Sequence, residues 1–465
     1  MEKFHLLHLS VLLLFLPVLN GELITETKVK DGLEEWGYAQ VRPKAHMFWW
    51  LYRSPHRVDN PSKPWPTILW LQGGPGGSGV KIGNFEEIGP LDSDLKPRNS
   101  TWLHVADLLF VDNPVGTGYS FVEDINVLVK TDVEAATDLS VLLEKIFNGN
   151  KSPLYIVAES YGGKFAVTLA LSIVKAIEAG KLKLNFGGVA LGDSWISPEE
   201  FVASWGPLLK DLSRLDTNGL KIANRITEKI KQQIKTGLFV NATTSWSDLE
   251  DAISFRSNNV DFYNFLLDSG ESSSSSSSLT DSKTTTSGNL KGITALKRYS
   301  TYLNSLSSIP GSDSNAEKDN LMDVILRKKL KIIPDNFLFG EQSDKVFDAM
   351  LGDFMKPRIT EVDELLAKGV NVTVYNGQLD LICSTKGTEA WVQKLKWKGL
   401  PNFLSQDRTP LYCGESKSTK GFTKSYQNLH FYWILKAGHF VPVDQPCISL
   451  EMVATIIQSP AVFKS

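Results

Sequence analysis

The first half of the chain alternates buried-strand patterns with helix patterns, and this alternation constrains the fold more than any other feature. Five mostly apolar runs are typical of strands, at Met47–Tyr52, Thr67–Leu71, Asp107–Val111, Leu154–Ala158 and Phe186–Leu191. Two segments with helical spacing lie among them, Asp132–Phe147 and Lys164–Ala179. Continuous apolar strands indicate a sheet covered by helices. The pattern therefore predicts an α/β fold with a central, mostly parallel sheet flanked by helices.

The pattern changes after Trp195. Residues 196–320 look largely helical and polar, and they contain a serine run at 272–278 and a threonine run at 284–286. The segment with the serine and threonine runs buries too little apolar surface to fold alone. It predicts a mobile loop that is open to proteolysis.

Strand patterns return at Val370–Tyr375 and Phe431–Lys436. We therefore predict one α/β core in two parts, residues 22–195 and 321–465, interrupted by a largely helical cap insertion at 196–320. A length of 465 residues would also allow about three domains.

The N-terminus has the pattern of a secretory signal peptide. Lys3 precedes an almost wholly apolar run from Leu6 to Leu19, and cleavage is expected near Gly21, so residues 1–21 are predicted to be removed. A buried N-terminal helix is the alternative. No later run approaches the ~20 apolar residues that a spanning helix needs. The mature protein is thus expected in the secretory pathway, either secreted or lysosomal.

Glycosylation sequons agree with this route. Four Asn-x-Ser/Thr triplets occur, at Asn99, Asn150, Asn241 and Asn371. Such triplets also arise by chance.

Three cysteines occur, Cys383, Cys413 and Cys447. This small, odd number indicates a fold held by its core, with one pair able to bridge and one thiol left free. The pairing stays open at this point. No Cys or His spacing matches a metal site, so no metal is expected.

Composition excludes some partners. The chain has 49 Lys+Arg and 52 Asp+Glu residues, with a net charge of −3 and no basic stripe, which argues against nucleic acid. With 42% hydrophobic residues the chain can bury a large core. The oligomeric state is not indicated.

One segment carries a chemical signature. In Leu154–Gly163 an apolar strand runs into Ser160, with a small residue two positions away on either side and a helix pattern directly after it. This arrangement resembles the G-x-S-x-G nucleophile elbow, with Ala158 in place of the first glycine. A strained strand-to-helix turn exposes the serine hydroxyl, and the backbone N–H of Tyr161 then points at a developing oxyanion. An ordinary strand end with a serine cap is the alternative.

A serine nucleophile needs a histidine base and an orienting carboxylate. In α/β hydrolases the order is Ser, acid, His, and only His430 and His439 follow Ser160. His430 begins a predicted strand, whereas His439 lies in a loop just past it, which favours His439. Asp380 follows the strand pattern at Val370–Tyr375 and is the preferred acid. Asp363 and Asp444 are weaker substitutes.

A second glycine-rich segment, Trp70–Gly77, follows another apolar strand. Its bare backbone could supply the other oxyanion N–H group. A tight turn is the alternative, and phosphate binding is disfavoured because no Gly-Lys-Ser/Thr is present.

Taken together, these segments resemble the serine carboxypeptidase family. The matching motifs run in family order and are WLQGGPGG (Trp70–Gly77), EEIGP (Glu86–Pro90), DNPVGTGYS (Asp112–Ser120), ESYGG (Glu159–Gly163), GQLDLIC (Gly377–Cys383) and GHFVPVDQP (Gly438–Pro446). The sequences of Gly83–Arg98 and Leu191–Pro198 are similar to those of the retinoid-inducible branch of that family.

The resemblance implies an α/β-hydrolase fold and roles for nine residues. It implies Ser160 as nucleophile, Asp380 as acid and His439 as base, with Gly74 and Tyr161 forming the oxyanion hole. It also implies that the substrate's C-terminal carboxylate is bound by Trp70, Gln72, Glu87 and Glu159. Two glutamates bind an anion only when they carry protons, so an acidic pH optimum is expected.

The chain departs from the family pattern at a few positions. Gly77 stands where a cysteine is common, Gln72 replaces the usual asparagine, and Phe440 is expected to shape the pocket for the leaving residue. Cys383 is expected to be buried and structural.

The resulting prediction is a serine carboxypeptidase that acts on peptide or protein C-termini through an acyl-enzyme and uses no metal or cofactor. An acyltransferase on the same scaffold and a non-catalytic binding protein are the alternatives. Lipase activity ranks lower because paired glutamates suit a neutral ester poorly.

Overall fold

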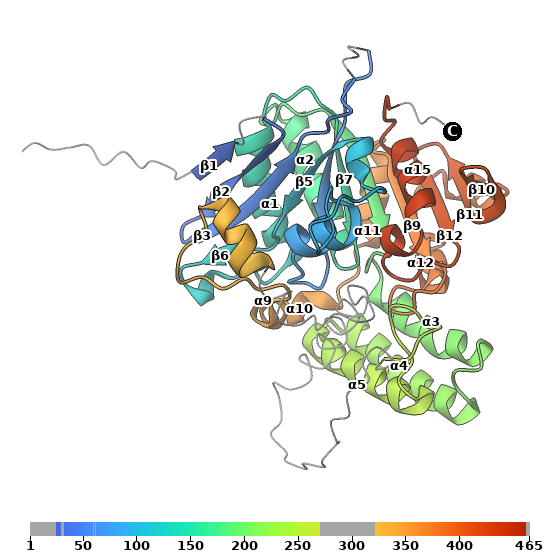
Figure 1. The fold of residues 1–465 in the computed structure, drawn as a ribbon. Coiled ribbons are helices and arrows are strands. Elements are labelled where there is room, and N and C mark those ends of the chain that lie inside the picture. The colour runs from blue at the N-terminus through green and yellow to red at the C-terminus, as the bar shows by residue number, and fades with distance from the viewer. Residues whose placement is uncertain (1–24, 29–31, 59, 61, 270–320, 462–465) are drawn as a thin grey trace, which may run out of the picture.

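The computed structural model describes residues 25–28, 32–58, 60, 62–269 and 321–461 (Figure 1). The predicted signal peptide and the serine and threonine runs of the insertion lie outside these residues.

A twelve-stranded mixed sheet forms the centre of the molecule, in the order β1-β2-β3-β5-β4-β7-β8-β9-β12-β11-β10, with β6 paired to β3. The six strands from β5 to β12 in this order are parallel, and the strands outside them pair antiparallel. The strands are β1 (Thr25–Lys28), β2 (Glu34–Arg42), β3 (Ala45–Tyr52), β4 (Thr67–Leu71), β5 (Asp107–Val111), β6 (Phe121–Val122), β7 (Leu154–Glu159), β8 (Phe186–Gly192), β9 (Val372–Gly377), β10 (Thr409–Cys413), β11 (Ser416–Tyr426) and β12 (Leu429–Ile434).

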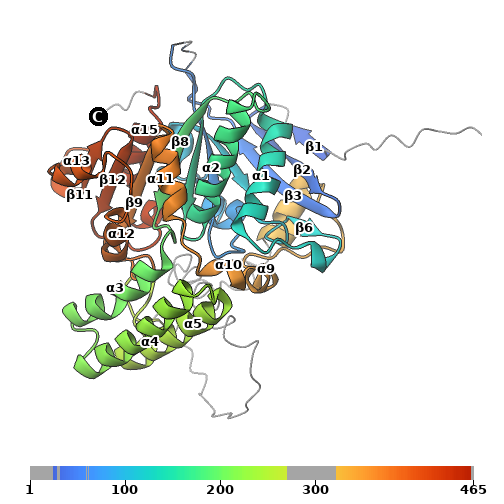
Figure 2. The ribbon, with the colours of Figure 1, turned by 180° about the vertical axis from the view of Figure 1, so that it is seen from behind.

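Helices cover both faces of the sheet. Helices α1, α2 and α11 lie on the face seen in Figure 2, and the π-helix η1 (Gly79–Ile88) and α15 lie on the other. The α-helices are α1 (Asp132–Phe147), α2 (Gly162–Glu178), α3 (Pro198–Asp211), α4 (Thr217–Lys235), α5 (Phe239–Ser257), α8 (Arg327–Leu330), α9 (Asp344–Ala349), α10 (Leu351–Phe354), α11 (Ile359–Ala367), α12 (Thr385–Val392), α13 (Leu400–Ser405), α14 (Val441–Asp444) and α15 (Pro446–Ile456). Short 3₁₀ turns lie at Trp102–His104 and Ile125–Val127, and a second π-helical turn at Leu321–Leu326. This layered architecture confirms the predicted α/β class.

The predicted bounds of β4, β5 and α1 coincide with the structure, but the last two predicted strands are displaced by two residues. Val370 N–H donates to Leu365 O in the turn that ends α11, so β9 begins only at Val372. Lys436 has a positive φ of 61°, which a strand does not allow, and β12 therefore ends at Ile434.

Helices α3, α4 and α5 lie within the predicted insertion and gather at one end of the sheet (Figures 1 and 2). An aromatic contact packs α5 against the core: the ring centroids of Trp246 in α5 and Phe354 in α10 are 4.7 Å apart. The segment after α5 returns to the edge of the sheet where the parallel strands end.

The cysteine pairing is now defined. Cys413 of β10 and Cys447 of α15 form a disulfide with a Cα–Cα distance of 6.1 Å, and Cys383 is free and fully buried, as expected. A disulfide is consistent with an oxidising compartment. Across the described ranges, no helix combines the length and apolar character that a membrane crossing requires.

Candidate active site

Four adjacent parallel strands each deliver a polar residue to one edge of the sheet. Ser160 directly follows β7, Asp193 directly follows β8, Asp380 comes three residues after the end of β9, and His439 lies in the loop after β12. The strands are neighbours in the order β7-β8-β9-β12. Because the carboxyl ends of parallel strands share one edge, ligands of α/β sheets bind there.

Ser160 occupies a tight turn between β7 and α2. Its φ of 60° is in the left-handed region, which a non-glycine residue rarely adopts, and its N–H donates to Gly192 O at 3.1 Å. A Cβ on Gly73 would lie 2.5 Å from the Ser160 Cβ, and one on Gly162 would lie 2.2 Å from Leu71 O. The loop after β4 therefore packs directly against the turn that holds Ser160, and both glycines are required by this close approach.

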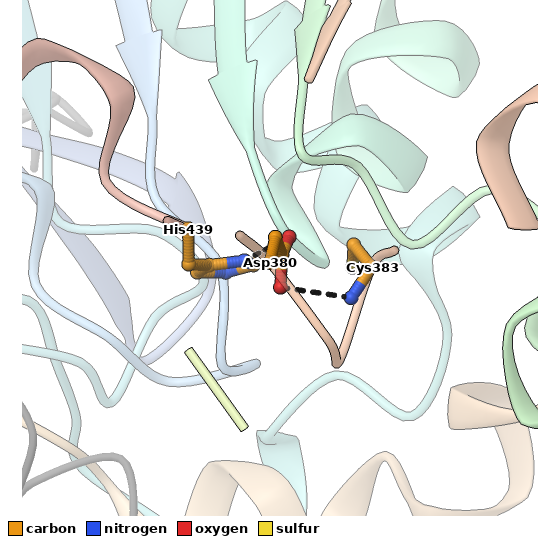
Figure 3. Close-up of side chains that lie close together, drawn as sticks. All are labelled: Asp380, Cys383 and His439. Atoms are coloured by element: carbon orange, nitrogen blue, oxygen red, sulfur yellow. Dashed lines mark hydrogen bonds and ion pairs between the residues drawn. The ribbon is translucent and has the colours of Figure 1, made fainter. Parts of the chain in front are cut away.

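Asp380 and His439 form a buried acid–base pair. His439 Nδ1 lies 2.8 Å from Asp380 Oδ2, and both side chains are fully buried. Figure 3 shows Asp380 between His439 and Cys383, whose N–H donates to Asp380 Oδ1 at 3.2 Å. This contact occupies the Nδ1 atom of the imidazole and leaves Nε2 free of Asp380.

The alternative residues lie elsewhere. Asp444 Oδ2 accepts the Gly438 N–H at 2.6 Å, and Asp363 Oδ1 accepts the N–H groups of Lys396 and Trp397. His430, in β12, lies 2.9 Å from Ser425 Oγ through Nδ1. None of these contacts involves His439.

The second imidazole nitrogen of His439, Nε2, is not engaged by Asp380. Nε2 is buried and makes no hydrogen bond to any described residue, Ser160 included. Hydrogen bonds between base and nucleophile are often long in a free enzyme and tighten when substrate binds. Nε2 is therefore the atom available to take a proton from a nucleophile or to give one to a leaving group.

The two residues expected in the oxyanion hole flank the turn at Ser160. Tyr161 precedes α2, and its hydroxyl donates to Asp353 Oδ2 at 2.5 Å, where Lys164 Nζ also donates at 2.9 Å. Gly74 follows β4 with a φ of 108°, and a Cβ there would meet the Gly76 and Gly77 nitrogens at 2.9 Å. The buried network thus fixes Tyr161 through its side chain and leaves its backbone at the turn.

Polar groups join the loop after β4 to the end of β7. Trp70 Nε1 donates to Gln72 Oε1 at 2.7 Å, and Gln72 Nε2 donates to Glu159 Oε1 at 2.8 Å. Glu87, near the end of η1, lies within hydrogen-bonding reach of Glu159, and both carboxyls are buried. Neither Glu87 oxygen nor Glu159 Oε2 has a donor among the described residues. Two facing acceptors form a hydrogen bond only when a proton lies between them.

The protonation of this pair follows from its burial. Burial raises the pKa of Glu87 to about 8, with a smaller contribution from the charge of Glu86. Burial raises the pKa of Glu159 well above its usual range, and the charge of Glu87 raises it further. The pair therefore holds at least one proton at neutral and acidic pH.

Two contributions to this edge were missed in the sequence. Asp193 stands beside Asp380, and the Gly-Asp step directly after a predicted strand was the signal that could have found it. The other is the segment after α5: His439 N–H donates to Tyr263 O at 2.8 Å, and the Leu381 and Ile382 N–H groups donate to Phe262 O at 3.1 and 2.8 Å. It lies in the polar insertion, where no sequence pattern marked it.

The sequons lie at or near the surface. Asn99, Asn241 and Asn371 are exposed and Asn150 is half-buried. Exposure is what a glycan requires, and glycosylation of these four residues stays a prediction.

The turn at Ser160, the buried acid–base pair and the mostly parallel sheet define the class of protein as an α/β hydrolase. A family model described as "Serine carboxypeptidase" matches residues 25–459. The chain belongs to the serine carboxypeptidase family and is a serine-type carboxypeptidase, a hydrolase.

Individual relatives agree with this assignment. The chain is 60% identical over 466 residues to serine carboxypeptidase-like 51 of Arabidopsis thaliana, covering 98% of this chain and 99% of that protein. It is 47% identical over 454 residues to the human retinoid-inducible serine carboxypeptidase, covering 96% and 97%. A crystal structure of Kex1(Δ)p, a prohormone-processing carboxypeptidase from Saccharomyces cerevisiae, matches with a TM-score of 0.71 at 22% identity over 91% of each chain. This last match supports the fold.

Proposed function

We propose that this carboxypeptidase releases one C-terminal residue per cycle, with Ser160 as nucleophile, His439 as general base and Asp380 as the acid that orients it. One observation carries the proposal: a buried pair of carboxyls, Glu87 and Glu159, directly adjoins the nucleophile, since Glu159 is the residue before Ser160. A group that binds the terminal carboxylate one residue from the nucleophile selects the last peptide bond for attack.

The chemistry proceeds in two halves. His439 Nε2 takes the Ser160 proton as Oγ attacks the carbonyl carbon, and Asp380 stabilises the imidazolium through its 2.8 Å contact with Nδ1. The N–H groups of Gly74 and Tyr161 bind the oxyanion. Imidazolium then protonates the leaving amine, the C–N bond breaks, and the terminal residue departs. Water then gives a proton to His439 and attacks the acyl carbon; the bond between that carbon and Ser160 Oγ breaks, the imidazolium returns the proton to Oγ, and the shortened peptide departs.

Recognition of the substrate's free end is assigned to Trp70, Gln72, Glu87 and Glu159. A neutral carboxyl in the glutamate pair donates a hydrogen bond to the substrate carboxylate, whereas an ionised pair repels it. The existing chain from Trp70 through Gln72 to Glu159 holds the pair in place. Binding of peptides with a free C-terminus should therefore weaken as the pair loses its protons.

This pH dependence is the test of the function. KM for a blocked dipeptide with a free C-terminus is expected to rise about tenfold per pH unit once the pH exceeds the raised pKa of the pair, which is about 8 for Glu87 before substrate binds. KM for the matching C-terminal amide, which carries no anion, is expected to change little between pH 5 and 9, roughly within threefold. Both are measured by release of the terminal residue.

Two variants make this test specific. Glu87→Gln keeps a hydrogen-bond donor that cannot ionise, so the rise of KM for the free acid should flatten. Glu178→Gln, an exposed residue of α2 paired with Lys368, is the control and should behave as the wild type. An unchanged KM profile in Glu87→Gln, or equal profiles for acid and amide, would contradict the role of the pair.

We also propose that the protein travels the secretory pathway and is secreted or lysosomal, with glycans on Asn99, Asn150, Asn241 and Asn371. The three exposed sequons, the half-buried one at Asn150 and the Cys413–Cys447 disulfide support this route. Protein isolated from its native cells is expected to lose mass on treatment with an N-glycosidase and to begin near residue 22. An intact N-terminus with no mass loss would refute it.

A further inference from the structure

Asp193 lies at the same edge of the sheet as Ser160, Asp380 and His439, and the proposed mechanism gives it no role. It directly follows β8 and adopts a φ of 40°, a strained value for a residue with a side chain. Its side chain is fully buried. Strain of this kind persists only where surrounding contacts impose it, and it points to a functional constraint.

Two hydrogen bonds join Asp193 to the end of β9, the strand that leads into the loop of Asp380. Its N–H donates to Tyr375 O at 2.9 Å, and its Oδ1 accepts the Gly377 N–H at 2.8 Å. Gly377 O in turn accepts the Asp380 N–H at 3.4 Å. A Cβ on Gly377 would lie 1.9 Å from Gly438 O, so this glycine also touches the loop of His439. Asp193 therefore holds the point where the acid and base loops meet.

The carboxyl of Asp193 lies beside the carboxyl of Asp380. The two carboxyls lie within hydrogen-bonding reach, and Asp193 Oδ2 is buried without a donor among the described residues. Asp380 Oδ2 already contacts His439 and Asp380 Oδ1 accepts from Cys383. A hydrogen bond between two carboxyls needs one proton.

We propose that Asp193 is a positioning residue for the catalytic acid: its protonated carboxyl donates a hydrogen bond to Asp380 while its other oxygen holds the Gly377 amide. This inference rests on the proposed role of Asp380. The bond orients Asp380 toward His439 and stabilises its negative charge in a buried site.

The electrostatic surroundings favour a neutral Asp193. Burial raises the pKa of Asp193 well above its usual range, and the charge of Asp380 raises it further. The other titratable groups that face it are Glu159, Asp444, Tyr375 and Cys383. Each is acidic or neutral, so none supplies a positive charge that would favour the ionised form.

The test compares Asp193→Gly with Asp193→Asn. Glycine adopts the positive φ without strain, so Asp193→Gly removes the carboxyl without a backbone penalty. Asparagine keeps an acceptor for Gly377 and a donor for Asp380. We expect kcat/KM to fall about 10- to 100-fold in Asp193→Gly, as for a lost charge-assisted hydrogen bond, and to stay within about threefold in Asp193→Asn.

The pH profile separates positioning from a merely structural role. When the hydrogen bond from Asp193 is lost, the negative charge of Asp380 is no longer shared with that donor. Asp380 then stabilises the imidazolium form of His439 more strongly. The acid limb of kcat/KM should then move up by about half a pH unit or more in Asp193→Gly and stay in place in Asp193→Asn. Loss of activity with no movement of the limb, full activity in Asp193→Gly, or a loss in Asp193→Asn as large as in Asp193→Gly would each overturn the proposal.

Two further variants keep the test decisive. If circular dichroism shows that Asp193→Gly does not fold, Asp193→Ser takes its place. The expectations are the same, because a serine side chain also lacks the carboxyl group. Ser160→Ala is measured in parallel. An active Ser160→Ala protein overturns the proposed function itself, whereas an inactive one with an unaffected Asp193→Gly protein overturns only the role of Asp193.

Discussion

Replacing Ser160 with alanine is expected to lower kcat by about 10⁴- to 10⁶-fold while leaving the fold and substrate binding in place. The side chain contributes only its hydroxyl to the site, whereas the turn is held by the backbone bonds of Ser160 to Gly192 and Trp195. The glutamate pair and the oxyanion N–H groups remain. Release of the terminal residue under single-turnover conditions measures the chemical step, and the KM for a free-acid peptide measures binding.

A matched serine on the following helix provides the control. Ser172 of α2 donates to Thr168 O at 3.1 Å within the helix, and among the described residues no hydrogen bond joins its side chain to the proposed site. Ser172→Ala should therefore keep wild-type turnover and react with a fluorophosphonate probe, whereas Ser160→Ala should not react. A Ser160→Ala protein that still turns over, or that is still labelled, would show that another residue is the nucleophile.

Much of the architecture could be predicted because it depends on local pattern. The strand runs at Thr67–Leu71 and Asp107–Val111 are apolar throughout, and the helix at Asp132–Phe147 begins with a Thr131 capping box. The turn at Ser160 could also be predicted, since small residues stand two positions before and after this serine at a strand end. Its neighbour Gly73 explains why: a Cβ there would collide with Ser160 itself.

The contacts that depend on tertiary structure could not be predicted. Three cysteines permit three single pairings, and only the packing of α15 beside β10 selects Cys413 and Cys447. The backbone carbonyls of Phe262 and Tyr263 support the acid and base loops, yet any residue supplies a carbonyl, so no side-chain pattern marks them. The contact of Asp193 is unpredictable for a related reason: its partner Asp380 lies 187 residues away in the sequence, and two facing carboxyls repel each other unless burial raises a pKa enough for one of them to keep its proton.

The choice of acid among Asp380, Asp444 and Asp363 was also open in the sequence, and its test carries the second largest expected effect. Asp380→Asn is expected to lower kcat by about 10⁴-fold with little change in stability. An asparagine keeps the shape of the side chain, but its amide can donate to His439 Nδ1. The imidazole then carries its proton on Nε2 and cannot accept one from Ser160.

Asp444→Asn is the matched control for Asp380→Asn. Within the described part of the chain, the Asp444 carboxyl accepts one hydrogen bond, from the Gly438 N–H, and an asparagine oxygen can accept the same bond. We therefore expect its kcat to stay within about tenfold of wild type, since one neutral hydrogen bond replaces a charged one. Both effects are read from single-turnover rates, with thermal melting to confirm the fold.

The reverse ranking, an active Asp380→Asn and an inactive Asp444→Asn, would assign the acid to the loop of the base itself. Such a result would be difficult to reconcile with the 2.8 Å contact between Asp380 and His439, because a carboxylate bound to Nδ1 fixes the tautomer that catalysis needs.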